Sequence, residues 1–238
     1  MSSSAAVDTV GAVDRTAGPV SRRERPAKPA LTRAGIVGTA LSLMRGEGVE
    51  RVTMRRLAKE LDTGPASLYV YVRDTEELHA AVLDELLAEV DLSPVTAPGP
   101  WRDRLFAVLR SYTGVLYAHP SLARTAVVTR PSGPHYLALI EALLQLLDQG
   151  EVPLDRAAWG VDLLLETATS AAAEHGTRNG PAGAKDFIEL STAMRAAPAD
   201  TYPAIAASAE EMLSGGRADR SRWRFDVLMS GIIATPRP

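Results

Sequence analysis

One short segment of the chain combines small polar and aromatic side chains with a spacing that suits the reading of nucleic acid. Residues 53–78 read TMRRLAKELDTGPASLYVYVRDTEEL. Apolar residues recur at helical spacing on both sides of a tight turn at 62–64, which predicts two short helices. In the second, Leu68 and Val72 face inward, and five residues are left facing outward: Pro65, Ala66, Ser67, Tyr69 and Tyr71. A helix-turn-helix places such a helix in the major groove, so the segment predicts binding of duplex DNA.

The distribution of charge agrees with this interpretation. The 238 residues carry a formal net charge of −3 at pH 7. Residues 21–73 hold eleven Lys and Arg against five acids, a balance of +6, whereas residues 74–238 sum to −8. A basic segment on an acidic chain is typical of a protein that presents one end to phosphates.

The elements around this segment are predicted to be helices. Apolar residues recur at helical spacing between residues 32 and 234 and no stretch alternates as a strand would, so we expect an all-α fold. The first helix should begin with Thr32 as its N-cap and end at Gly46 or Gly48. Residues 74–77 form an Asp variant of the capping box, which opens a long helix.

Further helices are predicted beyond the proline-rich stretch 93–100, which we interpret as a hinge or domain boundary. The helix at 133–148 is apolar nearly all round and is therefore predicted to be the central buried helix. A long helix at 154–175 should be followed by a loop at 176–184. The other predicted helices cover 101–118, 121–129, 185–196, 205–213 and a final one with an apolar stripe at 225–233.

Several classes of protein are disfavoured by the composition. The chain has no cysteine, which excludes disulfides and thiolate chemistry. No apolar run approaches the roughly 20 residues that span a bilayer, and the first residues lack the pattern of a signal peptide, so we expect a cytoplasmic location. The four histidines have no metal-ligand spacing, and neither a phosphate loop nor a nucleophile elbow is present. We expect no cofactor, no metal and no enzyme activity.

The layout resembles the TetR family of one-component bacterial repressors. The similarity covers nearly the whole chain after residue 31 and is strongest over 31–87. The C-terminal half resembles the ligand-binding domain of the tetracycline-repressor branch, through Thr129-Arg130-Pro131 and through the terminal stripe as a dimerisation helix. The resemblance implies three parts: a disordered basic arm at 1–30, a helix-turn-helix DNA-binding domain at 31–76, and a helical ligand-binding and dimerisation domain at 77–238.

The resemblance also implies base contacts. Arg55 falls where the tetracycline repressor reads a guanine, and arginine suits this role because its guanidinium can satisfy guanine O6 and N7 together. Ser67 and Tyr71 fall at base-facing positions. Pro65 and Ala66 fall there too, but they can make only apolar or shape contacts.

Contacts with phosphate are implied as well. Thr53 and Tyr69 fall at phosphate-contacting positions. Thr75 stands where the family often has a lysine, so affinity is expected to depend more on Arg55, Arg56 and the basic arm. Four residues of that arm are candidates for DNA binding: Arg22, Arg23, Arg25 and Lys28. The arm is either a solvated tail or an element that enters the minor groove.

For the C-terminal half the resemblance implies a cavity for a small molecule. It should be large and mostly apolar, with a few polar groups. Seven residues are candidates to line it: Tyr112, Arg130, His135, Tyr136, Trp159, Glu166 and Glu174. The simpler interpretation of Tyr112 and Trp159 is an ordinary core aromatic. Asp162 and Glu166 are consistent with a solvated stripe, a cavity lining or a dimer interface.

The position that ligates magnesium in the tetracycline repressor aligns with Ala126, which argues against a magnesium–tetracycline ligand.

The predicted function is a repressor that binds a palindromic operator as a homodimer and is released by a small-molecule effector, controlling efflux, resistance or secondary-metabolism genes. We expect a four-helix bundle from 154–175 and 222–234 of each subunit, with no membrane partner, and monomers when Met229 or Ile232 is replaced by a charge. The alternatives are a DNA-binding activator without a ligand switch, and a helical ligand-sequestering protein or enzyme.

Overall fold

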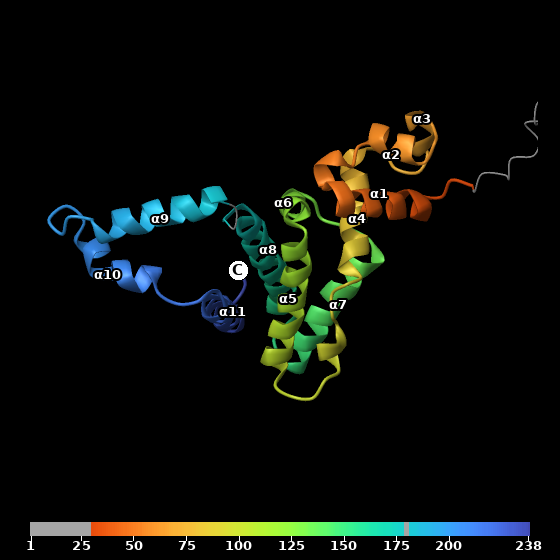
Figure 1. Cartoon of the computed structure of the whole chain (residues 1–238). Coiled ribbons are helices and arrows are strands. Elements are labelled where there is room, and N and C mark those ends of the chain that lie inside the picture. The colour runs from red at the N-terminus through yellow and green to blue at the C-terminus, as the bar shows by residue number, and fades with distance from the viewer. Residues whose placement is uncertain (1–29, 179–180) are drawn as a thin grey trace, which may run out of the picture. The chain divides into compact units, whose positions relative to one another are not determined.

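The structure is a computed structural model that describes residues 30–178 and 181–238, and all regular secondary structure in these two ranges is helical (Figure 1). Residues 32–238 form one compact unit. The elements are α1 (Arg33–Glu47), η2 (Val49–Arg51), α2 (Met54–Glu60), α3 (Pro65–Leu68), α4 (Thr75–Leu87), η3 (Ser93–Val95), α5 (Trp101–Ala118), α6 (Pro120–Val128), α7 (Pro134–Gln149), α8 (Leu154–Arg178), α9 (Pro181–Arg195), α10 (Pro203–Leu213) and α11 (Arg217–Ala234). The all-α prediction is confirmed.

The first three α-helices pack around a small apolar core. Thr32 is the N-cap of α1, as predicted, and its Oγ1 accepts a hydrogen bond from the backbone N–H of Gly35 at 3.0 Å. Gly48 ends the helix with a φ of 88°, a conformation that glycine adopts without strain. Leu57 and Ala58 of α2 are buried, whereas Leu61, expected on the same stripe, is half-buried.

Helix α4 connects these helices to the rest of the unit. Asp74 is its N-cap and accepts from the backbone N–H of Glu77 at 2.8 Å, as the capping-box pattern predicts. The Glu77 carboxylate returns to the N–H of Arg73 at 2.8 Å instead of that of Asp74. The buried face of α4 packs on α1 on one side and on α7 and α6 on the other.

The centre of the larger group of helices is formed by α5 and α8, which pack on each other, and α8 also packs on α6, α7 and α11. The prediction that the helix at 133–148 is the central buried one is wrong. Leu139, Leu143, Leu146 and Leu147 of α7 are buried, but Leu137 on the opposite face is 58% exposed. A leucine-rich helix can therefore lie at the surface of the unit and bury one face only.

The loop predicted at 176–184 is also wrong. Helix α8 continues to Arg178 and α9 begins at Pro181, while residues 179–180 lie outside the described residues. Proline is favoured in the first turn of a helix because its missing N–H would have no partner there. Helices α9 and α10 form a hairpin (Figure 1). Helix α9 also contacts α8, the helix that precedes it. The hairpin leaves several apolar side chains exposed: Phe187, Ile188, Leu190, Tyr202 and Met212.

No helix in the described part of the chain is both long enough and apolar enough to cross a membrane.

Candidate DNA-binding and ligand-binding sites

The turn between α2 and α3 has the geometry of a Schellman motif. Asp62 has a positive φ of 48°, the N–H of Thr63 donates to the carbonyl of Ala58 at 2.8 Å, and that of Asp62 donates to Lys59 at 3.2 Å. Aspartate tolerates this conformation better than most residues other than glycine. The turn therefore ends α2 sharply and allows α3 to begin at Pro65, as in a helix-turn-helix.

Helix α3 is shorter than the sequence indicates. It ends at Leu68 and is followed by turns, with the N–H of Val72 donating to Leu68 at 3.1 Å. The run Tyr69-Val70-Tyr71-Val72 explains this, because aromatic and β-branched side chains lose rotamer freedom in a helix. Leu68 and Val72 are buried, as predicted.

The residues predicted to face DNA on this element are accessible. Pro65, Ala66 and Ser67 are exposed, Tyr69 is 53% exposed and Tyr71 is half-buried. The surface they form carries hydroxyl and apolar groups and no formal charge, so any sequence reading here depends on hydrogen bonds and shape.

The two arginines of α2 differ in their partners. Arg55 is exposed and forms no ion pair or hydrogen bond with any residue that the structure describes. Arg56 donates to Glu47 and to Glu60, each at 2.7 Å, and the hydrogen bond to Glu47 is the main cause of its raised pKa. The Arg56 charge is thus already paired with two carboxylates, whereas that of Arg55 is not. Thr53 is the N-cap of α2 and accepts from the N–H of Arg56 at 3.2 Å, which leaves its hydroxyl proton able to donate.

Thr75 lies in the first turn of α4, half-buried and among acidic neighbours. The backbone N–H and then the side chain of Arg73 hold the pKa of Glu77 below its usual value, so this turn stays anionic near neutral pH. Thr75 therefore supplies no positive charge, as expected from its type. The other predicted DNA contacts, Arg22, Arg23, Arg25 and Lys28, lie outside the described residues.

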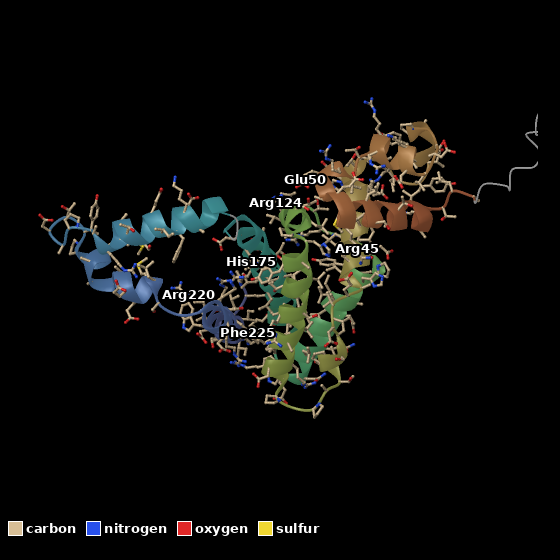
Figure 2. All side chains as sticks on the ribbon, viewed as in Figure 1. Arg45, Glu50, Arg124, His175, Arg220 and Phe225 are labelled. Atoms are coloured by element: carbon tan, nitrogen blue, oxygen red, sulfur yellow. The ribbon has the colours of Figure 1, made fainter. Side chains whose placement is uncertain are left out.

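A cavity of about 810 Å³, here called the large cavity, lies between one face each of α5, α8 and α11, with Phe187 of α9 and Met212 of α10 on its remaining side. At one end the rings of Phe106 and Phe225 are 5.1 Å apart. At the other end Tyr117 lies against His175, with ring centroids 4.0 Å apart. Figure 2 shows His175, Arg220 and Phe225 from two different helices around this region.

A second space of about 100 Å³, here called the small cavity, lies between α4, α5, α6, α7 and α8. The Tyr112 hydroxyl bonds to Thr169 Oγ1 at 2.7 Å inside it, and burial is the main cause that raises the pKa of Tyr112 to about 12. Arg130 forms an ion pair with Asp162 at 2.6 Å at its surface. Asp162 is therefore paired and does not belong to an isolated solvated stripe.

The predicted ligand-binding residues divide between these places. Tyr112, Arg130, Tyr136 and Glu166 line the small cavity, and Glu174 lines the large one. His135 and Trp159 line neither. The backbone N–H of His135 points at Asp84, and exposed Trp159 lies under the guanidinium of Arg237, 3.9 Å from the ring centroid.

Sequence reasoning missed most of the large cavity. Its face of α5 holds Phe106, Arg110, Thr113 and Tyr117, spaced by four, three and four residues. That spacing is a helical stripe of mixed aromatic and polar type. This stripe could have indicated the cavity, because mixed aromatic and polar residues on one face of a buried helix are more typical of a cavity wall than of core packing.

Two family models match the chain. Residues 36–82 match the model described as bacterial regulatory proteins, tetR family, and residues 93–235 match the one described as tetracyclin repressor-like, C-terminal domain. The chain therefore belongs to the TetR family of transcriptional regulators.

Similar proteins agree with this assignment. A helix-turn-helix-type transcriptional regulator of Saccharopolyspora erythraea is 32% identical over 216 residues, which are 87% of both chains. The solved structure of the Streptomyces protein SCO7704, assigned as a transcription regulator, is 55% identical with a TM-score of 0.76 and covers 89% of this chain and 98% of its own. The Streptomyces coelicolor TetR family protein ActR, solved in complex with actinorhodin, is 34% identical with a TM-score of 0.76, covering 87% of this chain and 97% of its own.

Proposed function

We propose that this protein is a ligand-responsive repressor that binds a palindromic operator as a homodimer and is released when a small molecule occupies the large cavity. One observation carries the proposal: the same compact unit holds an exposed helix-turn-helix and a cavity of about 810 Å³. Cavities of roughly 300–1,000 Å³ are typical of sites for drug-sized ligands. The complex of ActR with actinorhodin supports a ligand site in a chain of this fold.

The proposed DNA contacts follow the exposed surface of α2 and α3. Arg55 reads a guanine, Ser67 and Tyr71 face bases, and Thr53 and Tyr69 position the phosphates. Pro65 and Ala66 add shape contacts. In this division the DNA-binding domain covers residues 31–76, the ligand-binding and dimerisation domain covers 77–238, and residues 1–30 form a basic arm.

The proposed dimer interface is a four-helix bundle of α8 and α11 with the same helices of a second copy. Trp159 and Leu163 of α8 and Trp223 and Val227 of α11 are exposed apolar residues, whose burial against a partner is favourable. Met229 and Ile232 were expected to face the partner, but they are 0% and 8% exposed within one subunit. Ile232 packs beside Gly160 of α8 in the same chain. A charge at either position therefore tests folding and not dimerisation.

Two ion pairs are among the contacts that connect the ligand-binding helices to the DNA-binding helices. Arg124 of α6 forms an ion pair with Glu50 of η2 at 2.9 Å, and Arg45 of α1 pairs with Glu89 just beyond α4 at 2.5 Å (Figure 2). A ligand changes DNA binding only if it prefers one arrangement of these helices over the other. We propose that occupation of the large cavity shifts α6 and α4 to an arrangement that does not fit the operator, and thereby releases target genes for resistance, efflux or secondary metabolism.

The test is a gel shift on the intergenic DNA upstream of the protein's own gene, with and without a panel of small molecules. Binding that one compound releases is the expected result. In the variant Ala171→Trp, which fills the large cavity, DNA binding should persist and release should be lost. Ala138→Trp, at an exposed position of α7 outside both cavities, is the matched control. Binding that no compound releases, or release that survives the filled cavity, contradicts the proposal.

A further inference from the structure

We propose that the ligand of the large cavity is an aromatic acid, which carries a carboxylate on a planar ring system. This inference rests on the proposed function and names the chemical class of the effector. It is drawn from the charges, rings and pairing of the side chains that line the cavity.

The lining of the large cavity is positively charged in a part of the chain that is otherwise acidic. Four arginines line it, Arg110, Arg217, Arg220 and Arg224, against one carboxylate, Glu174. Residues 74–238 as a whole carry a balance of −8. The lining of the cavity therefore has a net positive charge, although residues 74–238 as a whole have a net negative charge. A positively charged site attracts anions.

The pairing of these arginines also differs from that of their neighbours. Arg222 of α11 does not line the cavity but lies over the rings of Phe106 and Phe225, and it is paired with Asp103 and Asp226. Arg195 of α9 is paired with Glu210. By contrast, Arg110 and Arg224 have no ion pair or hydrogen bond with a described residue. Two guanidinium groups that face one cavity without a carboxylate partner are suited to bind a carboxylate of a ligand.

Arg220, a third arginine of the cavity, keeps its charge. Arg220 donates to the carbonyl oxygens of Met212 at 2.5 Å and of Ser214 at 2.6 Å, which satisfies its donors without neutralising it. Arg217 lies against His175 and Tyr117. Burial, and then the charge of Arg217, hold the pKa of His175 below its usual value, so the positive charge of the cavity near neutral pH comes from arginine.

The positions of Arg110 and Arg224 place them on facing walls. The contacts Phe106–Phe225 and Tyr117–Arg217 at the two ends of the cavity show that α5 and α11 run antiparallel. Arg110 lies one turn from Phe106 on α5, and Arg224 precedes Phe225 on α11. Both residues therefore belong to the parts of α5 and α11 that border the Phe106–Phe225 end of the cavity.

The remaining walls suit a flat ring. Aromatic side chains lie at both ends, and between them the face of α8 offers small side chains such as Ala168 and Ala171. Aromatic side chains prefer offset or tilted contacts with a second ring. A planar ring between these ends, with its carboxylate toward Arg110 and Arg224, would satisfy both the apolar and the cationic parts of the lining.

The experiment compares three probes that share one ring: 2-naphthoate, which is anionic at pH 7, 2-naphthamide, which is neutral, and 2-naphthylmethylammonium, which is cationic. Binding of each to the full-length protein is measured by calorimetry. We expect 2-naphthoate to bind at least about ten-fold more tightly than the amide, and the cation to bind most weakly. The double variant Arg110→Gln/Arg224→Gln should lose this preference for the anion and retain binding of the amide.

Arg51→Gln, an exposed arginine of η2 outside the cavity, is the control and should keep the preference. Equal binding of the three probes, or a preference for the anion that survives the double variant, overturns the assignment of an aromatic acid.

The gel shift described above distinguishes failure of this ligand class from failure of the proposed function. Preferential binding of 2-naphthoate with no compound that releases DNA supports the ligand class and contradicts the switch. Release by a neutral or cationic compound, lost in Ala171→Trp, supports the switch and overturns the ligand class.

Discussion

Asp84 of α4 lies so close to Gly133 at the start of α7 that a Cβ at position 133 would stand 2.1 Å from its Oδ2. Gly133 is the N-cap of α7 and has no side chain to satisfy the free N–H groups of the first turn. Asp84, only 5% exposed, does so from the neighbouring helix and accepts from the N–H of Tyr136 at 2.9 Å. One buried carboxylate thus joins the helix that carries the DNA-binding domain to the ligand-binding helices.

Gly133→Ala should destabilise the protein by about 1–3 kcal/mol, because the methyl group must displace the Asp84 carboxylate from its partners. The measurement is urea unfolding at one fixed protein concentration. Gly38→Ala, in the middle of α1 with open space at its Cβ, is the matched control and should stabilise by about 0.5–1 kcal/mol. A Gly133→Ala protein as stable as the wild type would contradict the interhelical cap.

Arg55→Ala and Arg56→Ala should have different effects on DNA. Loss of the unpaired Arg55 should reduce discrimination at one guanine by about ten- to a hundredfold, because a bidentate contact to O6 and N7 is removed. Arg56→Ala should leave that discrimination unchanged, since Arg56 is held by Glu47 and Glu60. Fluorescence anisotropy with operators changed at single base pairs measures both. Equal loss of discrimination in the two variants would contradict the assignment.

Val227→Glu on the exposed face of α11 should give folded monomers with a mass near 25.4 kDa and weak operator binding, because a charge cannot be buried in an apolar bundle without a partner. Light scattering after size exclusion gives the mass, and circular dichroism tests the fold. Met229→Glu should instead lose its helical fold. Ala138→Glu on α7 is the control and should remain dimeric. A dimeric Val227→Glu protein would place the interface elsewhere.

Removal of residues 1–30 should weaken operator binding and reduce its dependence on salt. Each phosphate contact that is lost reduces the magnitude of the negative slope of log K against log salt by about 0.9. Loss of four basic residues therefore reduces it by roughly 3–4. The full-length chain with Arg22, Arg23, Arg25 and Lys28 replaced by Gln separates charge from length. Unchanged affinity and slope in both proteins would show that the arm does not touch DNA.

Thr169→Val should destabilise the protein more than Tyr112→Phe. Thr169 donates its hydroxyl proton to the carbonyl of Leu165 at 2.7 Å, so the Tyr112 hydroxyl must be the donor in their shared bond. Tyr112→Phe removes that bond at a cost of about 1 kcal/mol, whereas Thr169→Val leaves a buried hydroxyl without an acceptor and costs about 1–3 kcal/mol. Thermal unfolding of both variants gives the order, and the reverse order would refute the assigned donor.

The same pair has a consequence at high pH. Burial raises the pKa of Tyr112 from 10.0 to about 12, so the folded protein holds this proton more tightly than the unfolded chain. The stabilisation is complete below pH 10 and is lost as the pH rises toward 12. Ultraviolet difference spectra should show one tyrosine that ionises late, and this component should be absent in Tyr112→Phe.

Local features were predictable from the sequence because neighbouring residues determine them. Thr32 and Asp74 were recognised as N-caps from their type and from the helices that follow. The bounds of α5 followed from Pro100 before it and from the proline after His119. The run from 176 to 184 failed because its small residues are compatible with helix as well as with loop, and packing of α8 on its neighbours decides between them.

The cavities were less predictable because they depend on residues far apart in the chain. Arg110 and Arg224 face the same space only through the packing of α5 and α11 around α8. Likewise α11 has apolar residues on two faces, and the sequence alone does not show that Met229 packs inward while Val227 remains exposed. Four of the seven ligand residues named from the resemblance line one small cavity, but the space large enough for a ligand lies on another face of α5 and α8.

The hairpin of α9 and α10 supplies Phe187 and Met212 to the large cavity, yet it packs mainly on itself and on α8. Substitutions in the hairpin can therefore change the size and shape of the ligand that fits, while the helices that position the DNA-binding domain keep their contacts. If the protein were selected for a response to new inducers, we expect substitutions to accumulate first at Phe187 and Met212. Adaptation of the sensor would then proceed at low cost to folding and without altering which operator is recognised.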